Sequence, residues 1–164
     1  MAPNPGAGPT PGPDGRLRCP WAISAPDYRD YHDSEWGVPL HGEAALFERL
    51  SLEAFQSGLS WLTILRKRDA FRRAFMDFTP AVVAGFTEDD VARLLTDVGI
   101  VRNRAKIEAT VRNARAATEL DQSLDALLWS YAPDPAERLA PRTTAEVPTR
   151  TCESEAMARA LRRR

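Results

Sequence analysis

The sequence has little cysteine, little net charge and no long apolar run. Its two cysteines stand 133 positions apart, so they supply no disulfide framework, which fits a reducing cytosol. No stretch approaches the roughly 18 apolar residues of a membrane span, and the N-terminus lacks the apolar core of a signal peptide. The formal net charge of −1 excludes a protein coated in positive charge. We therefore expect a cytoplasmic location, and any contact with nucleic acid must use a local patch.

The alternation of apolar and polar residues that marks β-strands is also missing, which favours an all-α fold. Apolar residues recur at helical spacing over residues 43–56 and 60–75. Gly58 separates these two runs, and Ser60 is a candidate N-cap for the second. Further helices are predicted to begin at Pro80 and to cover 87–95, 103–120, 123–131 and 153–164.

The N-terminus differs in composition from the rest of the chain. The first 15 residues contain five prolines and four glycines, too little apolar surface to order themselves. We therefore predict a disordered tail over residues 1–17 and one helical domain over residues 18–164. The segment 133–148 holds four prolines and is predicted to be a loop.

Chemistry-bearing side chains gather between Cys19 and Trp61. These 43 residues hold both histidines, three of the four tryptophans and two of the three tyrosines. A helical protein that needed only a core would use Leu, Ile and Val there. Aromatic rings beside a carboxylate indicate a pocket for a flat ligand, and a cationic one would be held best.

Three smaller patterns each have a functional and a plain interpretation. Glu53 and Trp61 could share a helical face, or they could be a surface carboxylate beside a core tryptophan. Cys19 and His32 could be two of four zinc ligands, or a buried thiol and a hydrogen-bonded histidine. Residues 94–107 predict a helix, a glycine turn and a basic helix. That layout suits a helix-hairpin-helix that holds a DNA phosphate, but it also suits an ordinary corner with solvated arginines.

Taken in order, these blocks resemble one family. The segments C-P-W, Y-R-D-Y-H-D-S-E-W-G-V-P, L-E-A-F-Q-S-G-L-S-W and G-I-V-R-N-R-A-K-I are similar to those of DNA-3-methyladenine glycosylase I. The resemblance runs from about Arg18 to Arg164. It implies an all-α helix-hairpin-helix DNA glycosylase that acts in base-excision repair on double-stranded alkylated DNA as a monomer. The excised base would be 3-methyladenine, taken out of the stack before its N-glycosidic bond is hydrolysed.

The resemblance also implies roles for individual residues. Glu53 would be the catalytic carboxylate that accepts hydrogen bonds from the flipped base, and Trp61 and Tyr31 would stack on it. The remaining roles are the pocket wall (Tyr28 and Trp21), the wedge into the base stack (Leu59) and the DNA-binding hairpin (Gly99, Arg102, Arg104 and Lys106). Asp121 lies where many glycosylases of the superfamily carry a catalytic aspartate. This family works without one, so Asp121 is expected to be a surface residue of a monofunctional enzyme.

Zinc is the cofactor that the resemblance implies, in a structural role. Cys19 and His32 would be half of its site, and the other two ligands, a later histidine and cysteine, are absent from the sequence. We therefore expect a chain that lacks the family's C-terminal segment and binds zinc weakly or not at all. The alternative to an active enzyme is a non-catalytic helix-hairpin-helix remnant that binds DNA without releasing a base, and a helical interaction protein with no DNA role comes third.

Overall fold

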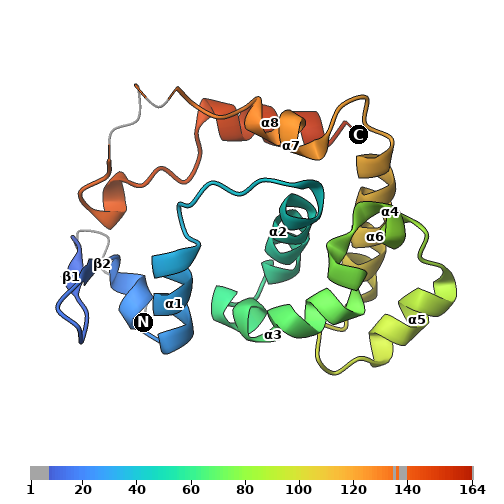
Figure 1. The fold of residues 1–164 in the computed structure, drawn as a ribbon, viewed down its shortest axis with the longest axis horizontal. Helices are drawn as coiled ribbons and strands as arrows, with labels where there is room; N and C mark the ends of the chain where they lie inside the picture. The colour runs from blue at the N-terminus through green and yellow to red at the C-terminus, as the bar shows by residue number, and fades with distance from the viewer. Residues whose placement is uncertain (1–7, 135, 137–139, 164) are drawn as a thin grey trace. The chain divides into compact units, whose positions relative to one another are not determined.

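The computed structural model of the chain describes residues 8–134, 136 and 140–163. These residues are mostly helical, which confirms the predicted all-α class (Figure 1). Their contacts divide them into two compact units. Unit 1 comprises the described parts of Met1–Pro39 and Tyr131–Arg164, and unit 2 comprises Leu40–Ser130. The single domain predicted over residues 18–164 stays a prediction. Within the part of the chain that the structure describes, no helix is long and apolar enough to cross a membrane.

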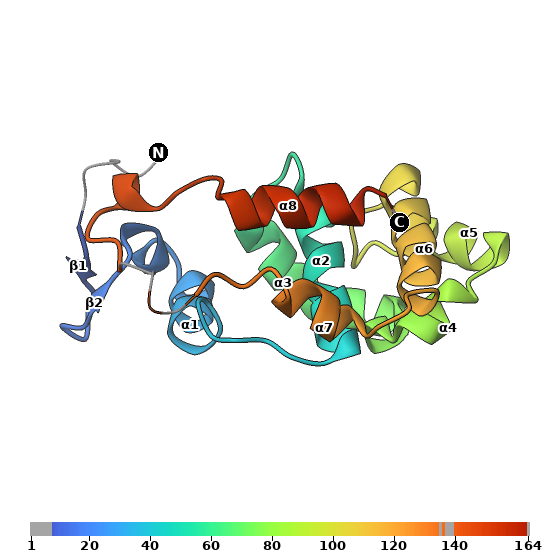
Figure 2. The ribbon, with the colours of Figure 1, turned by 90° about the horizontal axis from the view of Figure 1, so that it is seen from above.

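Unit 2 contains the predicted helices of the middle of the chain. In order they are α2 (Glu43–Gln56), α3 (Trp61–Ala74), α4 (Pro80–Ala84), α5 (Glu88–Thr96), α6 (Arg104–Thr118) and α7 (Leu124–Trp129). The ends of α2, α3, α5, α6 and α7 lie within two residues of the predicted ranges, and α4 begins at Pro80 as predicted. Both views show α4 beside α6, and α7 packs against α2 (Figures 1 and 2).

Side-chain caps fix where several of these helices begin. The Ser60 hydroxyl accepts a hydrogen bond from the backbone N–H of Thr63 at 3.2 Å, which confirms Ser60 as the N-cap of α3. Thr87 and Asp90 form a reciprocal capping box at the start of α5. The Asn103 side chain accepts a hydrogen bond from the third residue of α6 at 3.2 Å. The sequence therefore sets these boundaries locally, before any packing between helices.

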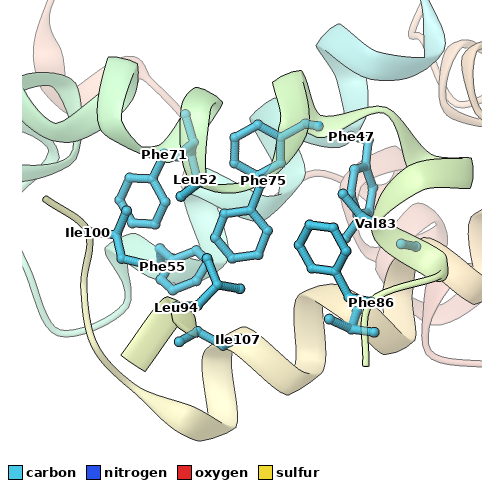
Figure 3. Close-up of a cluster of buried hydrophobic side chains, with 14 of the residues drawn as sticks. Phe47, Leu52, Phe55, Phe71, Phe75, Val83, Phe86, Leu94, Ile100 and Ile107 are labelled. Atoms are coloured by element: carbon cyan, nitrogen blue, oxygen red, sulfur yellow. The ribbon is translucent and has the colours of Figure 1, made fainter. Parts of the chain in front are cut away.

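The core of unit 2 is a stack of phenylalanine rings. Phe55 from α2 lies with its ring centroid 4.6 Å from that of Phe71 in α3, and Phe75 stacks on Phe78 at 5.2 Å. All four side chains are fully buried. Leucine, isoleucine and valine side chains from α4, α5 and α6 surround these rings (Figure 3). Burying each ring contributes about 1.5–3 kcal/mol, so this cluster fixes α2 against α3.

Unit 1 begins with a structure that the sequence does not predict. Residues 8–17 belong to the predicted disordered tail, yet β1 (Thr10–Pro11) pairs antiparallel with β2 (Leu17–Arg18). That prediction is wrong for these residues, and residues 1–7 lie outside the described part of the chain. The buried guanidinium of Arg18 explains the order, because it bonds the carboxylates of Asp14 at 2.6 Å and Asp33 at 2.6 Å.

The rest of unit 1 is helical. A short 3-10 turn, η1 (Pro20–Ile23), leads into α1 (Pro26–Ser34), and the 3-10 turn η4 (Thr144–Glu146) precedes α8 (Cys152–Leu161). Helix α8 confirms the predicted C-terminal helix, with a capping box at Thr151. Helix α1 has no counterpart among the ranges predicted from the sequence, because its polar and aromatic residues show no apolar period.

Candidate active site

An aromatic cluster in unit 1 is built around Trp21, which the turn η1 presents to one side of α1. The Tyr28 ring meets the Trp21 ring edge to face at 5.7 Å, and the Tyr31 ring lies 6.3 Å away at a tilt. The edge-to-face arrangement of Tyr28 on Trp21 is one that aromatic quadrupoles favour. Tyr28 and Tyr31 are three positions apart, so they share a face of α1. The structure therefore brings these three predicted pocket residues together.

Trp36 completes this group, although it is not among the site residues predicted from the sequence. Its ring lies 5.4 Å from that of Trp21 and stacks on the His32 imidazole at 5.6 Å. It follows the end of α1, where Gly37 has a φ of +78° and redirects the chain. The available signal was the tryptophan in the E-W-G segment. We name Trp21, Tyr28, Tyr31, His32 and Trp36 the Trp21 cluster.

Glu53 and Trp61 lie on adjoining elements of unit 2, but not on one continuous helix. Helix α2 ends at Gln56 and α3 begins at Trp61, so the sequence argument from a shared helical face does not apply. Arg49 connects the two instead. It lies one helical turn before Glu53, and its guanidinium carbon is 5.7 Å from the centre of the Trp61 ring. The chain thus folds back so that Trp61 reaches the α2 face that carries Glu53.

Glu53 combines exposure with an altered acidity. The residue is exposed to solvent, but partial desolvation of its carboxylate raises its pKa above the usual range for glutamate. The positive charge of Arg49 acts in the opposite direction and lowers the pKa. A carboxylate placed in this way can accept hydrogen bonds from a ligand that reaches it. Glu53 and Trp61 belong to unit 2 and the Trp21 cluster to unit 1, so a pocket lined by both stays a prediction.

The turn between α2 and α3 presents Leu59. Gly58 adopts a φ of +81°, a left-handed conformation that residues with a Cβ rarely adopt. Leu59 follows, 40% exposed, with its N–H bonded to the carbonyl of Gln56 at 2.6 Å. An exposed leucine at the tip of a tight turn fits a wedge between bases, and that role stays a prediction.

The α5–α6 hairpin has its turn at Gly99 and basic residues at the start of α6, in the order that the sequence predicts. Its three cations differ in their surroundings. Arg104 forms ion pairs with Glu88 and Glu108. The Lys106 ammonium donates hydrogen bonds to two backbone carbonyls of the α2–α3 segment. Arg102 is exposed and makes no ion pair with another described residue, so it is the cation best placed for a phosphate.

The residues expected to bind zinc are neighbours. The Cys19 N–H donates a hydrogen bond of 3.4 Å to His32 Nε2, and His32 Nδ1 lies 3.0 Å from an Asp33 carboxylate oxygen. These two contacts assign the proton to Nδ1 and make Nε2 the acceptor of the Cys19 N–H. Burial raises the pKa of the Cys19 thiol. Among residues 8–134, 136 and 140–163, no three His, Cys, Asp or Glu side chains group as metal ligands. Weak or absent zinc binding by Cys19 and His32 stays a prediction.

Comparison with known proteins identifies the family. Residues 21–164 match the family model for methyladenine glycosylase. The chain is 42% identical to DNA-3-methyladenine glycosylase 1 of Escherichia coli (strain K12) over 150 residues, which cover 90% of this chain and 80% of that protein. A match of this extent and identity shows that the chain belongs to the methyladenine glycosylase family.

Solved structures agree with this assignment. The crystal structure of a 3-methyladenine DNA glycosylase I superposes with a TM-score of 0.81 at 40% identity, covering 89% of this chain and 82% of that chain. The glycosylase I of Staphylococcus aureus, studied for its recognition of 3-methyladenine, gives a TM-score of 0.82 at 37% identity, covering 88% and 79%. The all-α glycosylase fold is therefore confirmed.

Proposed function

We propose that this chain is a DNA glycosylase that excises 3-methyladenine from alkylated DNA, the first step of base-excision repair. The observation that carries the proposal is membership of the methyladenine glycosylase family, together with 42% identity to the enzyme of Escherichia coli. Double-stranded DNA is the proposed partner and the monomer the proposed working form, in the cytoplasm. The enzyme is monofunctional: water attacks the sugar, and no lysine nucleophile takes part.

The chemistry of the lesion explains the kind of residues at the site. Methylation at N3 places positive charge on the adenine ring and weakens the glycosidic bond, so the leaving group needs little activation. The base must first leave the stack, which costs less for a damaged base than for a paired one. Trp61 would then stack on the cationic ring, a contact worth about 0.5–2 kcal/mol that neutral adenine would lose.

Glu53 has the central role in this proposal. Its carboxylate accepts hydrogen bonds from the flipped base, and its negative charge favours the cationic lesion over adenine. Tyr31 stacks on the base, and Tyr28 and Trp21 form the wall beside it. The edge-to-face contact of Tyr28 with Trp21 supports this grouping, because it holds both rings in fixed orientations.

DNA contact is assigned to the α2–α3 turn and to the α5–α6 segment, which we propose to be a helix-hairpin-helix. Backbone N–H groups of the turn hold a phosphate and Arg102 adds positive charge beside it, whereas Arg104 shares its charge with Glu88 and Glu108. Leu59 fills the space that the base leaves. The exposure of Leu59 and Arg102 supports this assignment. These contacts are independent of DNA sequence, which suits an enzyme that must search for rare lesions.

The test is release of free 3-methyladenine from methylated duplex DNA under single-turnover conditions. In Glu53→Gln the rate should fall by about 10- to 100-fold, because a hydrogen bond to a charged acceptor becomes a neutral one. In Trp61→Ala it should fall by about 2- to 30-fold, which corresponds to the loss of a stacking contact of about 0.5–2 kcal/mol.

Asp121→Asn is the matched control, because this exposed carboxylate lies outside the site. It should release the base at the wild-type rate. Full activity in both Glu53→Gln and Trp61→Ala would contradict the assignment of these two residues to the base-binding pocket. DNA binding by the wild-type protein without any base release would instead support the non-catalytic remnant.

A further inference from the structure

Lys106 points away from the hairpin surface on which its sequence position would place it. It lies in the first turn of α6, but its ammonium donates hydrogen bonds to the backbone carbonyls of Phe55 at 2.9 Å and Ser57 at 2.6 Å. Phe55 lies in the last turn of α2, and Ser57 is the C-cap residue that follows it. A cation bound in this way is held by two acceptors inside unit 2, so it is not a freely exposed charge.

Those carbonyls are the ones that a helix end leaves without partners. The last carbonyls of an α-helix lack intrahelical donors, and the partial negative charge of the helix gathers there. Just beyond α2, Gly58 turns the chain in a left-handed conformation, and the N–H of Leu59 donates to the carbonyl of Gln56. Lys106 supplies donors and a positive charge at this end, so it acts as a C-cap contributed by another helix.

A second lysine makes a matching contact on the hairpin. The Lys67 ammonium, from α3, donates hydrogen bonds to the carbonyls of Val98 and Gly99, both at 3.0 Å. The hairpin turn approaches α3 so closely that a Cβ on Gly99 would lie 2.9 Å from the Cβ of Ala70. The side chain of Ile100 is buried beside Phe71 and Phe55 (Figure 3). The turn is thus fixed to α3, as α6 is fixed to the end of α2.

We propose that Lys106 is a positioning residue that fixes the end of α2, with Glu53 and the Leu59 turn, to the hairpin that binds DNA, and that it does not contact phosphate. Lys67 has the same function for the hairpin turn. This inference rests on the proposed glycosylase function. When the hairpin binds the DNA sugar-phosphate backbone, Glu53 and Leu59 are then held at a fixed distance from the bound strand. No hinge separates the hairpin from the end of α2. Arg102 remains the cation of the turn that faces solvent.

The experiment compares Lys106→Met with Arg102→Met. Methionine keeps the apolar stem of either side chain and removes its charge and donors. Two quantities are measured: the salt dependence of binding to an undamaged duplex, and the single-turnover rate of 3-methyladenine release at saturating methylated DNA. A phosphate contact contributes about one unit to the slope of log Kd against log salt concentration.

The expected result is a wild-type salt slope for Lys106→Met together with base release slowed by about 10- to 100-fold, since a misplacement of about 1 Å can cost this much. Arg102→Met should lower the slope by about one. A Lys106→Met variant whose slope falls by about one while its release rate stays at the wild-type value overturns the proposal. If Lys106→Met does not fold, Lys106→Gln takes its place, because glutamine retains an amide donor. A wild-type salt slope for Lys106→Gln supports the positioning role, and a slope lowered by about one overturns it.

Failure of the glycosylase function can be recognised separately. A wild-type protein that releases no 3-methyladenine contradicts the proposed function, but the positioning role is still measured by amide hydrogen exchange. Lys106→Met should then accelerate exchange at residues 55–60 and leave α7 as protected as in the wild type. Unchanged protection at residues 55–60 would overturn the positioning role whatever the enzyme does.

Discussion

Arg49, like Trp36, lies near the candidate site although the sequence pattern does not predict it. Its guanidinium lies over the Trp61 ring, and its charge acts on the Glu53 carboxylate one turn further along α2. Both effects act before DNA arrives: the tryptophan ring is held in place, and the charge of Arg49 offsets part of the desolvation that raises the pKa of Glu53. Arg49 is therefore a candidate for tuning the pH range of the enzyme.

The pH dependence of base release should follow the ionisation of Glu53. The ionised carboxylate is the acceptor, so activity is present above its pKa and is lost as the pH falls through it. Desolvation raises that pKa, and Arg49 lowers it. Arg49→Met removes the lowering influence, so the acid limb of the single-turnover rate should move to higher pH.

The exposed Arg112 on α6 offers the control, since Arg112→Met removes a similar charge elsewhere on unit 2. Its acid limb should coincide with that of the wild type. An acid limb that stays in place in Arg49→Met, or moves to lower pH, would contradict the assignment of this titration to Glu53.

The sequence predicts which kinds of residue form the site better than it predicts which groups each side chain contacts. The tyrosine–histidine–tryptophan block pointed to an aromatic site, and the structure groups Trp21, Tyr28 and Tyr31 as that interpretation requires. The sequence pattern groups Lys106 with Arg102 as a phosphate contact, because both are basic and close together. The direction of a lysine side chain depends on acceptors about 50 positions away in the chain, and no local pattern contains that information.

Helices and turns of this protein follow their local signals where those signals are complete. The strongest example is α5, where Thr87 and Asp90 satisfy each other's backbone donors and three acidic residues occupy the first turn. Helix α5 is the first half of the hairpin, so its stability bears directly on the proposed DNA contact.

Removing this cap should destabilise the protein measurably. Thr87→Ala eliminates the side-chain acceptor of the capping box, and we expect the free energy of unfolding to fall by about 0.5–2 kcal/mol. Urea denaturation measures the change. Thr118→Ala, at the exposed end of α6, removes a threonine without a capping role and should cost less than about 0.5 kcal/mol. Equal losses in the two variants would show that the capping box adds no measurable free energy of unfolding.

Elements without a periodic signal could not be predicted. Helix α1 begins at Pro26 and is mostly polar and aromatic, so no apolar stripe marks it. The β1–β2 hairpin lies in a segment whose proline and glycine content is typical of disorder. Its order depends on Arg18 bonding Asp33, 15 positions further on, and an ion pair of that kind is visible only once the chain has folded.

Zinc, if it were part of this protein, would dominate the stability of the folded chain. A structural zinc ion contributes about 10–16 kcal/mol of apparent binding free energy, so its removal is easily detected. The geometry at Cys19 and His32 leads us to expect no such contribution. A strong chelator should leave the melting temperature unchanged, and Cys19→Ser should bind no less zinc than the wild type.

The measurement is a thermal melt with and without chelator, accompanied by metal analysis of the purified protein. A melting temperature that falls on chelation and recovers with added Zn²⁺ would contradict this expectation. It would also show that ligands beyond Cys19 and His32 take part.

The clamp around Arg18 has a practical consequence for work with this protein. Asp14 and Asp33 hold one buried guanidinium from two sides, and Asp14 precedes the segment shared with the family, which begins at Trp21. A version of the protein trimmed to that shared segment would lose Arg18 and Asp14 together. One trimmed at residue 16 would keep the arginine but lose one of its two counter-charges. The N-terminus should therefore be kept back to at least Thr10, where the hairpin begins.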